Sequence, residues 1–251
     1  MKTKIEDKTV AVWFSNGAAS AVSAKIIIDE YGESNNVLLI NNPIKEEDED
    51  NLRFKEDVSN WLDHPIIEAK AKDYPNSSIV EVFDKNKFMS DTKFAICSYC
   101  LKKQARYEFE VKNEIDFHVL GFTLEEKHRH ERFILKERPN VIPALISHKL
   151  RKGHCFDIIR NAGIKLPKRY KWFNNANCKG CVRASSPTYW NQERKINPDV
   201  FEQRAIQSRE IGCKLVELKG QRIFLDELKP TDKGGKIQTL ECGVFCDMEF
   251  T

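Results

Sequence analysis

Cysteines are the residues of this chain whose type and spacing point most directly to chemistry. The 251-residue sequence holds eight of them, and six fall in three pairs: Cys97 with Cys100, Cys178 with Cys181, and Cys242 with Cys246. A C-x-x-C pair offers two thiolates from one turn, and two such pairs complete a tetrahedral sulfur shell for zinc or an iron–sulfur cluster. Disulfides and buried apolar thiols are the alternatives, but a reduced cytosol argues against the first and clustering against the second. The pattern therefore predicts a metal site.

The predicted ligands come from these pairs. Cys178 and Cys181 are the first two, and Cys97 is the third. The fourth is either Cys100, which would close two C-x-x-C pairs, or a cysteine of the C-terminal tail, where Cys246 is the candidate. Zinc and a [4Fe-4S] cluster both accept four thiolates, so the spacing leaves the identity of the metal open.

A second group of residues with chemical potential is a loop of small side chains near the N-terminus. It consists of Ser15, Asn16, Gly17, Ala18, Ala19 and Ser20, called here the 15–20 loop. The loop follows an apolar run and precedes a helical pattern, so it predicts a strand-to-helix turn at which backbone N–H groups can approach an anion. It lacks the G-x-x-x-x-G-K pattern of nucleoside triphosphatases and the G-x-G-x-x-G pattern of dinucleotide folds.

The surrounding sequence alternates between short apolar runs and amphipathic segments. We expect strands at residues 9–14, 37–40, 65–69 and 117–122, with helices between them. This order predicts an α/β fold, a parallel twisted sheet with flanking helices whose ligands bind at the carboxyl ends of the strands. Residues 1–145 form the expected nucleotide-binding domain. Residues 146–251 form a cysteine-rich, mostly helical region expected to complete the site, with helices near residues 155–159 and 198–211.

The charge distribution indicates a partner that carries phosphate. The net charge is +3, but residues 146–195 hold twelve Lys or Arg against two acids, Asp157 and Glu193. Such a bias is typical of surfaces that meet a nucleotide or a nucleic acid, although a merely solvated basic face has the same composition. No apolar run approaches the about 20 residues that cross a bilayer, and the N-terminus shows no apolar leader, so we expect a soluble, cytoplasmic protein without a membrane partner.

The 15–20 loop resembles the S-G-G-x-D-S pyrophosphate loop of the adenine-nucleotide alpha-hydrolase (PP-loop) superfamily, in the degenerate form found in phosphoadenosine phosphosulfate (PAPS) reductases. Other stretches resemble that family in the same order: Cys97-Ser98-Tyr99-Cys100-Leu101-Lys102 its C-C-x-x-x-K region, Gly121 to Glu126 with Arg129 its Gly-rich turn and arginine, residues 143–170 its P-L-x-x-W and L-P-x-x-x-L-Y segments, Asn177 to Arg183 its G-C-x-x-C-T-R, and Glu241-Cys242-Gly243-Val244-Phe245 its C-terminal E-C-G-I-H. The resemblance covers residues 10–246. It is greatest to the reductase-like proteins of phages and mobile elements, which share Trp-Phe-Ser-x-Gly-Ala-Ala-Ser-Ala-Val and a Cys-x-Gly-Cys-Val segment followed by Tyr-Trp-Asn.

The resemblance implies roles for particular residues. The 15–20 loop, together with Gly121 and Arg129, is expected to bind an adenine nucleotide, which is PAPS, adenylyl sulfate (APS) or ATP. Cys242 stands where the reductases carry their nucleophile, on a tail that can meet both the nucleotide and a thioredoxin-like reductant. Cys242 and Cys246 are alternatively metal ligands that fix the tail to Cys178 and Cys181.

The sequence leaves three functions open, because it departs from the family pattern. Ala19 replaces the loop aspartate, Ser98 the second cysteine of the first pair, and Phe245 the histidine of the tail. The leading hypothesis is reduction of an adenylyl sulfate by the Cys242 thiolate. The alternatives are an ATP-dependent sulfur transferase that adenylates nucleic acid, and a non-catalytic nucleotide-binding module with a structural metal site. Loss of the aspartate favours the first or third function, and the basic 146–195 stretch favours the second.

Overall fold

The chain folds into two compact units, each assembled from separate segments. The structure is a computed structural model that describes residues 5–91 and 94–234. Unit 1 comprises Met1–Pro43, Glu49–Ala69 and Tyr107–Lys168, and unit 2 comprises Ile44–Asp48, Lys70–Arg106 and Arg169–Thr251. The boundary expected from the sequence, between residues 145 and 146, falls inside unit 1. The reason is that α8 (Lys152–Asn161) packs against α1 (Ala18–Tyr31).

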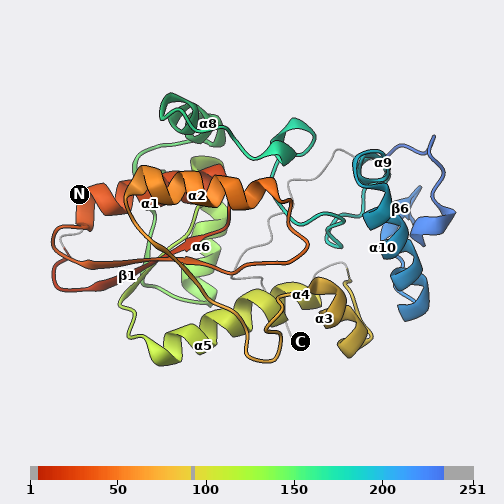
Figure 1. Ribbon diagram of the computed structural model, residues 1–251, viewed down its shortest axis with the longest axis horizontal. Helices are drawn as coiled ribbons and strands as arrows, with labels where there is room; N and C mark the ends of the chain where they lie inside the picture. Colours follow the sequence, from red (N-terminus) through yellow and green to blue (C-terminus); the bar gives the residue numbers. More distant parts are fainter. Residues whose placement is uncertain (1–4, 92–93, 235–251) are drawn as a thin grey trace. The chain divides into compact units, whose positions relative to one another are not determined.

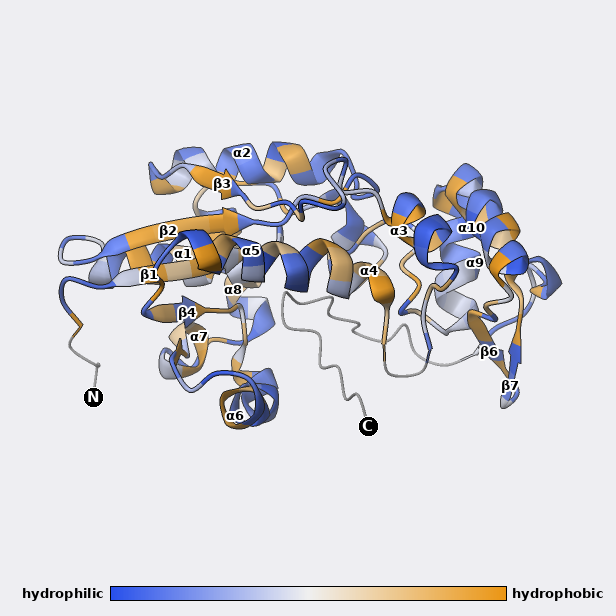
Figure 2. Ribbon diagram, turned by 90° about the horizontal axis from the view of Figure 1, so that it is seen from below, coloured by the Kyte–Doolittle hydropathy of each residue, from blue (hydrophilic) through white to orange (hydrophobic). Residues whose placement is uncertain are grey.

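Unit 1 is built on a five-stranded sheet with the order β3-β2-β1-β4-β5, in which every pair is parallel. The strands are β1 (Thr9–Phe14), β2 (Asn36–Asn41), β3 (Ile66–Glu68), β4 (Phe117–Val119) and β5 (Val141–Ile142). Every residue of β1 from Val10 to Phe14 is buried, as expected for a parallel strand covered on both faces, and Figure 2 shows the hydrophobic character of β2 beside it. The predicted α/β class is therefore confirmed.

Two details of the sheet differ from the prediction. β5 was not expected, because a two-residue strand shows no periodicity. β4 ends at Val119 instead of Phe122, because the N–H of Phe122 donates to the carbonyl of Leu120 at 2.8 Å and turns the chain at Gly121.

Helices cover both faces of this sheet (Figure 1). They are α1, α2 (Asp50–Leu62), the part of α5 (Gln104–Lys112) that begins at Tyr107, α6 (Lys127–Lys136), α7 (Ala144–Ser147) and α8. Successive side chains of a strand point to opposite faces. Phe14 stacks on Phe54 of α2 with 6.4 Å between ring centroids, whereas Trp13 meets Phe109 of α5 edge-on at 6.1 Å. α2 and α5 therefore lie on opposite faces, and α1 lies in the layer of α2, with which it is in contact.

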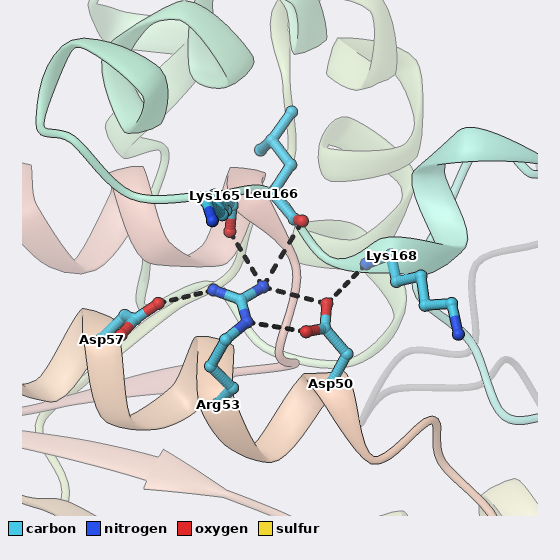
Figure 3. A network of polar contacts seen from close by, with 6 residues as sticks. All are labelled: Asp50, Arg53, Asp57, Lys165, Leu166 and Lys168. Atoms are coloured by element: carbon cyan, nitrogen blue, oxygen red, sulfur yellow. Dashed lines mark hydrogen bonds and ion pairs between the residues drawn. The ribbon is translucent and has the colours of Figure 1, made fainter.

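A polar network holds the segment after α8 against α2 (Figure 3). Arg53 donates to the two carboxylate oxygens of Asp50 at 2.6 and 2.9 Å and to Asp57 at 2.5 Å. The same guanidinium donates to the carbonyl of Lys165 at 3.1 Å, and Asp50 accepts the backbone N–H of Lys168 at 2.7 Å. The hydrogen bonds from Arg53 keep the pKa of Asp50 below its usual value. The network fixes the chain at the point where unit 1 ends, at Lys168.

Unit 2 is mainly helical. Its elements are α3 (Ile79–Asn86), α4 (Ile96–Ser98), a π-helical turn η1 (Tyr99–Lys103), α9 (Pro187–Ile196), α10 (Pro198–Ile211), the strands β6 (Val216–Leu218) and β7 (Gln221–Ile223), and a 3-10 turn η4 (Leu225–Glu227). The antiparallel β6–β7 hairpin corrects the expectation of a region without strands. Lys219 and Gly220 both have positive φ, 52° and 79°, which is the backbone of a two-residue hairpin turn.

No helix within the described residues combines the length and apolar character that crossing a membrane requires.

Candidate nucleotide site and thiol cluster

The 15–20 loop links the carboxyl end of β1 to the amino end of α1, as the sequence predicts. Gly17 is the N-cap residue of α1 and has an extended backbone, with φ −114° and ψ 157°. Asn16 has φ 55°, a left-handed conformation that asparagine adopts more readily than most residues. The first turn of α1 contains no acidic residue, so no carboxylate within the turn offsets the partial positive charge of the helix N-terminus.

The hydroxyls of Ser15 and Ser20 hold this loop in shape. Ser20 Oγ donates to the carbonyl of Gly17 at 2.9 Å and accepts the backbone N–H of Ser15 at 3.1 Å. Because a hydroxyl carries one proton, Ser15 Oγ must be the donor in its 3.1 Å contact with Ser20 Oγ. The two serines therefore preorganise the turn at the carboxyl edge of the sheet.

The turn after β4 lies directly against this loop. A Cβ on Gly121 would lie 2.9 Å from the amide nitrogen of Ser20 and 3.2 Å from the carbonyl carbon of Ala19, too close for any side chain. β1 and β4 are the neighbours at which the strand order of the sheet reverses. Open α/β sheets bind their ligands at such a switch point. The structure thus brings together the 15–20 loop and Gly121, two of the elements predicted to bind a nucleotide.

Arg129, the remaining residue predicted to bind the nucleotide, lies on α6 and braces the same turn. Its guanidinium is ion-paired with Glu126 and lies 5.5 Å from the ring centroid of Phe122. Glu126 in turn accepts the backbone N–H of Thr123 at 3.2 Å. Arg129 therefore stabilises the residues that follow Gly121, and its contact with a nucleotide stays a prediction.

In unit 2, Cys178 and Cys181 stand at the two ends of a tight turn, called here the 178–181 turn. The two residues are 7% and 8% exposed. Gly180 within the turn has φ +60°, and a Cβ on it would lie 2.9 Å from Val200 Cγ1. Both the backbone conformation and the close packing require glycine, which accounts for the Cys-x-Gly-Cys sequence.

A buried network centred on Glu193 supports the 178–181 turn. Glu193 Oε1 accepts the N–H of Gly180 at 3.2 Å and the hydroxyl of Tyr189 at 2.9 Å, and the carboxylate is ion-paired with Arg169. The Tyr189 oxygen accepts the N–H of Cys181 at 2.9 Å. Glu193 and Arg169 are 0% and 1% exposed, so these charge-assisted bonds act in a low dielectric, where they are strong. The network fixes the backbone that carries the second pair of thiols.

Three of the predicted metal ligands lie close to a buried arginine. Arg204 of α10 is 1% exposed, and its Nε–H has no acceptor among the described residues. Burial lowers the pKa of Arg204, and the interactions with Cys97, Glu46, Cys178 and Cys181 oppose that shift. Cys97 and the second C-x-x-C pair therefore act on the same guanidinium, although they are about 80 residues apart in the sequence.

Cys100 has a different partner. It lies in the π-helical turn η1, and π turns inside helices often occur at functional sites. Its thiol is 4% exposed and hydrogen-bonded to Tyr74, and burial raises its pKa. Cys100 shares the hydrophobic core of unit 2 with Cys178 and Cys181, and Cys97 packs against that core.

No group of three or more His, Cys, Asp or Glu side chains in the described part of the chain has a metal-binding arrangement. The chemistry of the donors nevertheless fits a thiolate-bound metal. Zinc and iron–sulfur clusters take four thiolates, and the resulting negative charge would face the buried guanidinium of Arg204. Cys242, the predicted nucleophile, and Cys246, the predicted tail ligand, lie outside the described residues.

Comparisons with known proteins give one structural likeness. No protein-family profile matches the chain, and no curated protein sequence matches it. Among solved structures, the chain is similar to the U34-tRNA thiolase NcsA from Methanococcus maripaludis with its [4Fe-4S] cluster. The TM-score is 0.43 and the sequence identity 15%, over 82% of this chain and 70% of that one. A proposal of function therefore depends on the residues of this chain.

Proposed function

We propose that this chain is a nucleotide-dependent sulfur enzyme of the PP-loop superfamily. The observation that carries the proposal is the contact between Gly121 and Ser20, which places a strand-to-helix loop of small residues at the switch point of a parallel sheet. A phosphate or sulfate group fits there because the helix N-terminus offers backbone N–H donors and partial positive charge. The 15–20 loop binds the anionic part of an adenine nucleotide in this proposal.

The second part of the proposal is a metal centre in unit 2. Cys97, Cys178 and Cys181 are its first three ligands, and Cys100 or Cys246 is the fourth. Support comes from the common electrostatic environment of the first three thiols at Arg204 and from the rigid 178–181 turn. The metal is a [4Fe-4S] cluster or zinc, since both suit four thiolates.

Of the two reactions that such a protein can perform, sulfur transfer to nucleic acid has support from the surface of unit 1. Residues 146–168 hold six Lys or Arg and a single acid, Asp157. Many of these side chains are exposed: Lys149, Arg151, Arg160, Lys165 and Lys168, together with His154. Exposed basic residues of this density attract a phosphate backbone. An enzyme of this kind uses ATP to adenylate the nucleic acid before sulfur enters.

Reduction of an adenylyl sulfate by a cysteine thiolate is the second candidate. The observation in its favour is the Glu241-Cys242-Gly243 sequence, which resembles the C-terminal segment that carries the nucleophile of PAPS reductases. This reaction needs a thiol-based reductant such as a thioredoxin and releases sulfite.

Calorimetry and product analysis on anaerobically purified protein test the proposal. We expect ATP or PAPS to bind to the parent and not to Gly17→Val, because a branched side chain at the N-cap blocks the approach of an anion to the backbone. Release of AMP and pyrophosphate from ATP, dependent on added RNA or DNA, identifies the transferase. Release of sulfite from PAPS with thioredoxin identifies the reductase. Equal affinity of the Gly17→Val variant and the parent would remove the nucleotide site from this loop.

A further inference from the structure

Arg204 is a buried positive charge whose hydrogen bonds are incomplete. Its side chain is 1% exposed. Nη1 donates to Gln207 Oε1 at 2.5 Å, and the guanidinium carbon lies 5.0 Å from the ring centroid of Phe83. Within the described residues, however, Arg204 forms no ion pair, and its Nε–H has no acceptor. Arginine stays protonated in proteins, so this site buries a full charge with a neutral amide and an aromatic ring as its direct partners.

Burying a charge without a counter-charge is costly, and proteins retain such a group only where something compensates it. The nearby carboxylate of Glu46 is already held by the Ser78 hydroxyl at 2.6 Å and the Ile79 N–H at 2.9 Å. Glu46 therefore contributes to the field at Arg204 without pairing with it directly.

The unpartnered Nε–H lies against the 178–181 turn. A Cβ on Gly180 would lie 3.7 Å from Arg204 Nε, which places this nitrogen beside the backbone between Cys178 and Cys181. Cys178, Cys181 and Cys97 are also the thiols that act on the charge of Arg204. Neutral thiols are weak acceptors, whereas thiolates are strong ones.

We propose that Arg204 is the counter-charge of a thiolate metal centre formed by Cys97, Cys178 and Cys181, and that its Nε–H donates to a cysteine sulfur of that centre. The inference rests on the metal site of the proposed function and deepens it. Zinc or a [4Fe-4S] cluster with four thiolates carries net negative charge, which a buried guanidinium stabilises. Arg204 is thus a positioning and charge-balancing residue, one layer outside the ligands.

This role has a consequence that distinguishes it from a purely structural one. In the metal-loaded protein, loss of the guanidinium leaves the negative centre without its counter-charge, so the variant is less stable than the parent. In the metal-free protein, the guanidinium itself is the uncompensated charge. Replacing it by an apolar group of similar length then leaves stability unchanged or raises it. The effect of one substitution is expected to differ in sign, or at least in size, between the two forms.

The test compares melting temperatures of the full chain with and without metal. The metal-loaded form is reconstituted anaerobically with zinc, or with iron and sulfide, and the metal-free form is prepared with a chelator and a reductant. Arg204→Met removes the charge and the donors, and Arg204→Lys keeps the charge. Arg209→Met is the matched control on the same helix, because Arg209 is exposed and pairs with Asp226 at 2.6 Å.

For Arg204→Met we expect a lower melting temperature with metal, an equal or higher one without it, and at least tenfold weaker metal retention against a competing chelator. Arg204→Lys should lie between this variant and the parent, and Arg209→Met should retain metal as the parent does. Equal losses of stability in both forms, with unchanged metal retention, overturn the role of Arg204 while the metal site stands. A parent that takes up neither zinc nor a cluster overturns the metal site itself. If Arg204→Met does not fold, the same comparison of the two forms decides on Arg204→Lys.

Discussion

Gly121 lies so close to Ser20 that a Cβ on the glycine would stand 2.9 Å from the serine amide nitrogen. This contact joins the ends of two adjacent strands, because Ser20 belongs to the first turn of α1 after β1 and Gly121 follows β4. A larger residue at position 121 must move the backbone of the 15–20 loop. The spacing between these two turns therefore sets the shape of the proposed phosphate site.

Gly121→Ala is expected to weaken binding of adenine nucleotides at least tenfold, about 1.4 kcal/mol, in calorimetry. The physical reason is displacement of the Ser20 amide and the N-terminal turn of α1. Gly153→Ala is the control, because a Cβ on Gly153 meets nothing within 4 Å and the residue lies in helix α8. Equal affinities of the Gly121→Ala and Gly153→Ala proteins would show that this contact does not shape the binding site.

The central strands of the sheet could be predicted, whereas its edge and the division into units could not. β1 and β2 are continuous apolar runs, and that pattern is typical of parallel strands buried on both faces. β5 has two residues, too few for a pattern. The assignment of residues 146–168 to unit 1 depends on the packing of α8 on α1, a contact between distant segments that local periodicity does not encode.

Gly180→Ala is expected to lower the free energy of unfolding by about 1–2 kcal/mol from backbone strain alone, with a further loss from the contact with Val200. Metal content should fall with it, because the substitution displaces the backbone between Cys178 and Cys181. Gly212→Ala separates the two effects, since Gly212 has φ +80° but nothing within 4 Å of an added Cβ. Thermal unfolding and metal analysis of both variants are the measurements, and identical metal content in both would contradict the prediction.

Tyr189→Phe is expected to destabilise the protein by about 1–3 kcal/mol, because it leaves the buried N–H of Cys181 without its acceptor and removes one donor to Glu193. The 178–181 turn should then hold its thiols less firmly. Transfer of metal to a chromogenic chelator should become faster, which a spectrophotometer follows directly. An unchanged transfer rate in a folded Tyr189→Phe protein would mean that the network supports the fold and not the thiols.

The cysteine pairs and the 15–20 loop could be recognised in the sequence because each is a local pattern. Arg204 and Glu193 were missed as site residues, because their partners come from distant segments and a charged residue is ordinarily expected on the surface. One signal was available for Arg204. Phe201, Ala205 and Ser208 are buried at helical spacing in α10, and Arg204 falls on the same face.

Asp50→Asn is expected to lower the melting temperature near neutral pH, by an amount corresponding to about 1 kcal/mol for a partly exposed charge network. The pKa of Asp50 in the folded protein lies below the usual 3.8, chiefly because of Arg53. A carboxyl group with a depressed pKa stabilises the fold above its unfolded pKa, and this stabilisation is lost as the pH falls through the folded value. The difference between parent and variant should therefore be full at pH 7 and disappear below pH 3.8. A difference independent of pH would contradict the assignment to this carboxylate.

Cys178→Ser and Cys242→Ser are expected to separate metal binding from nucleophilic chemistry. Cys178→Ser should lose the metal and melt at a lower temperature, because the free energy of metal binding is also free energy of folding. Cys242→Ser should keep the metal, and Cys242 in the parent should react with iodoacetamide faster than Cys178, as mass spectrometry of the alkylated peptides will report. Bound nucleotide should slow that reaction at Cys242. Loss of the metal in both variants would make Cys242 a ligand, exclude it as the nucleophile of an adenylyl sulfate reductase, and leave ATP-dependent sulfur transfer as the reaction.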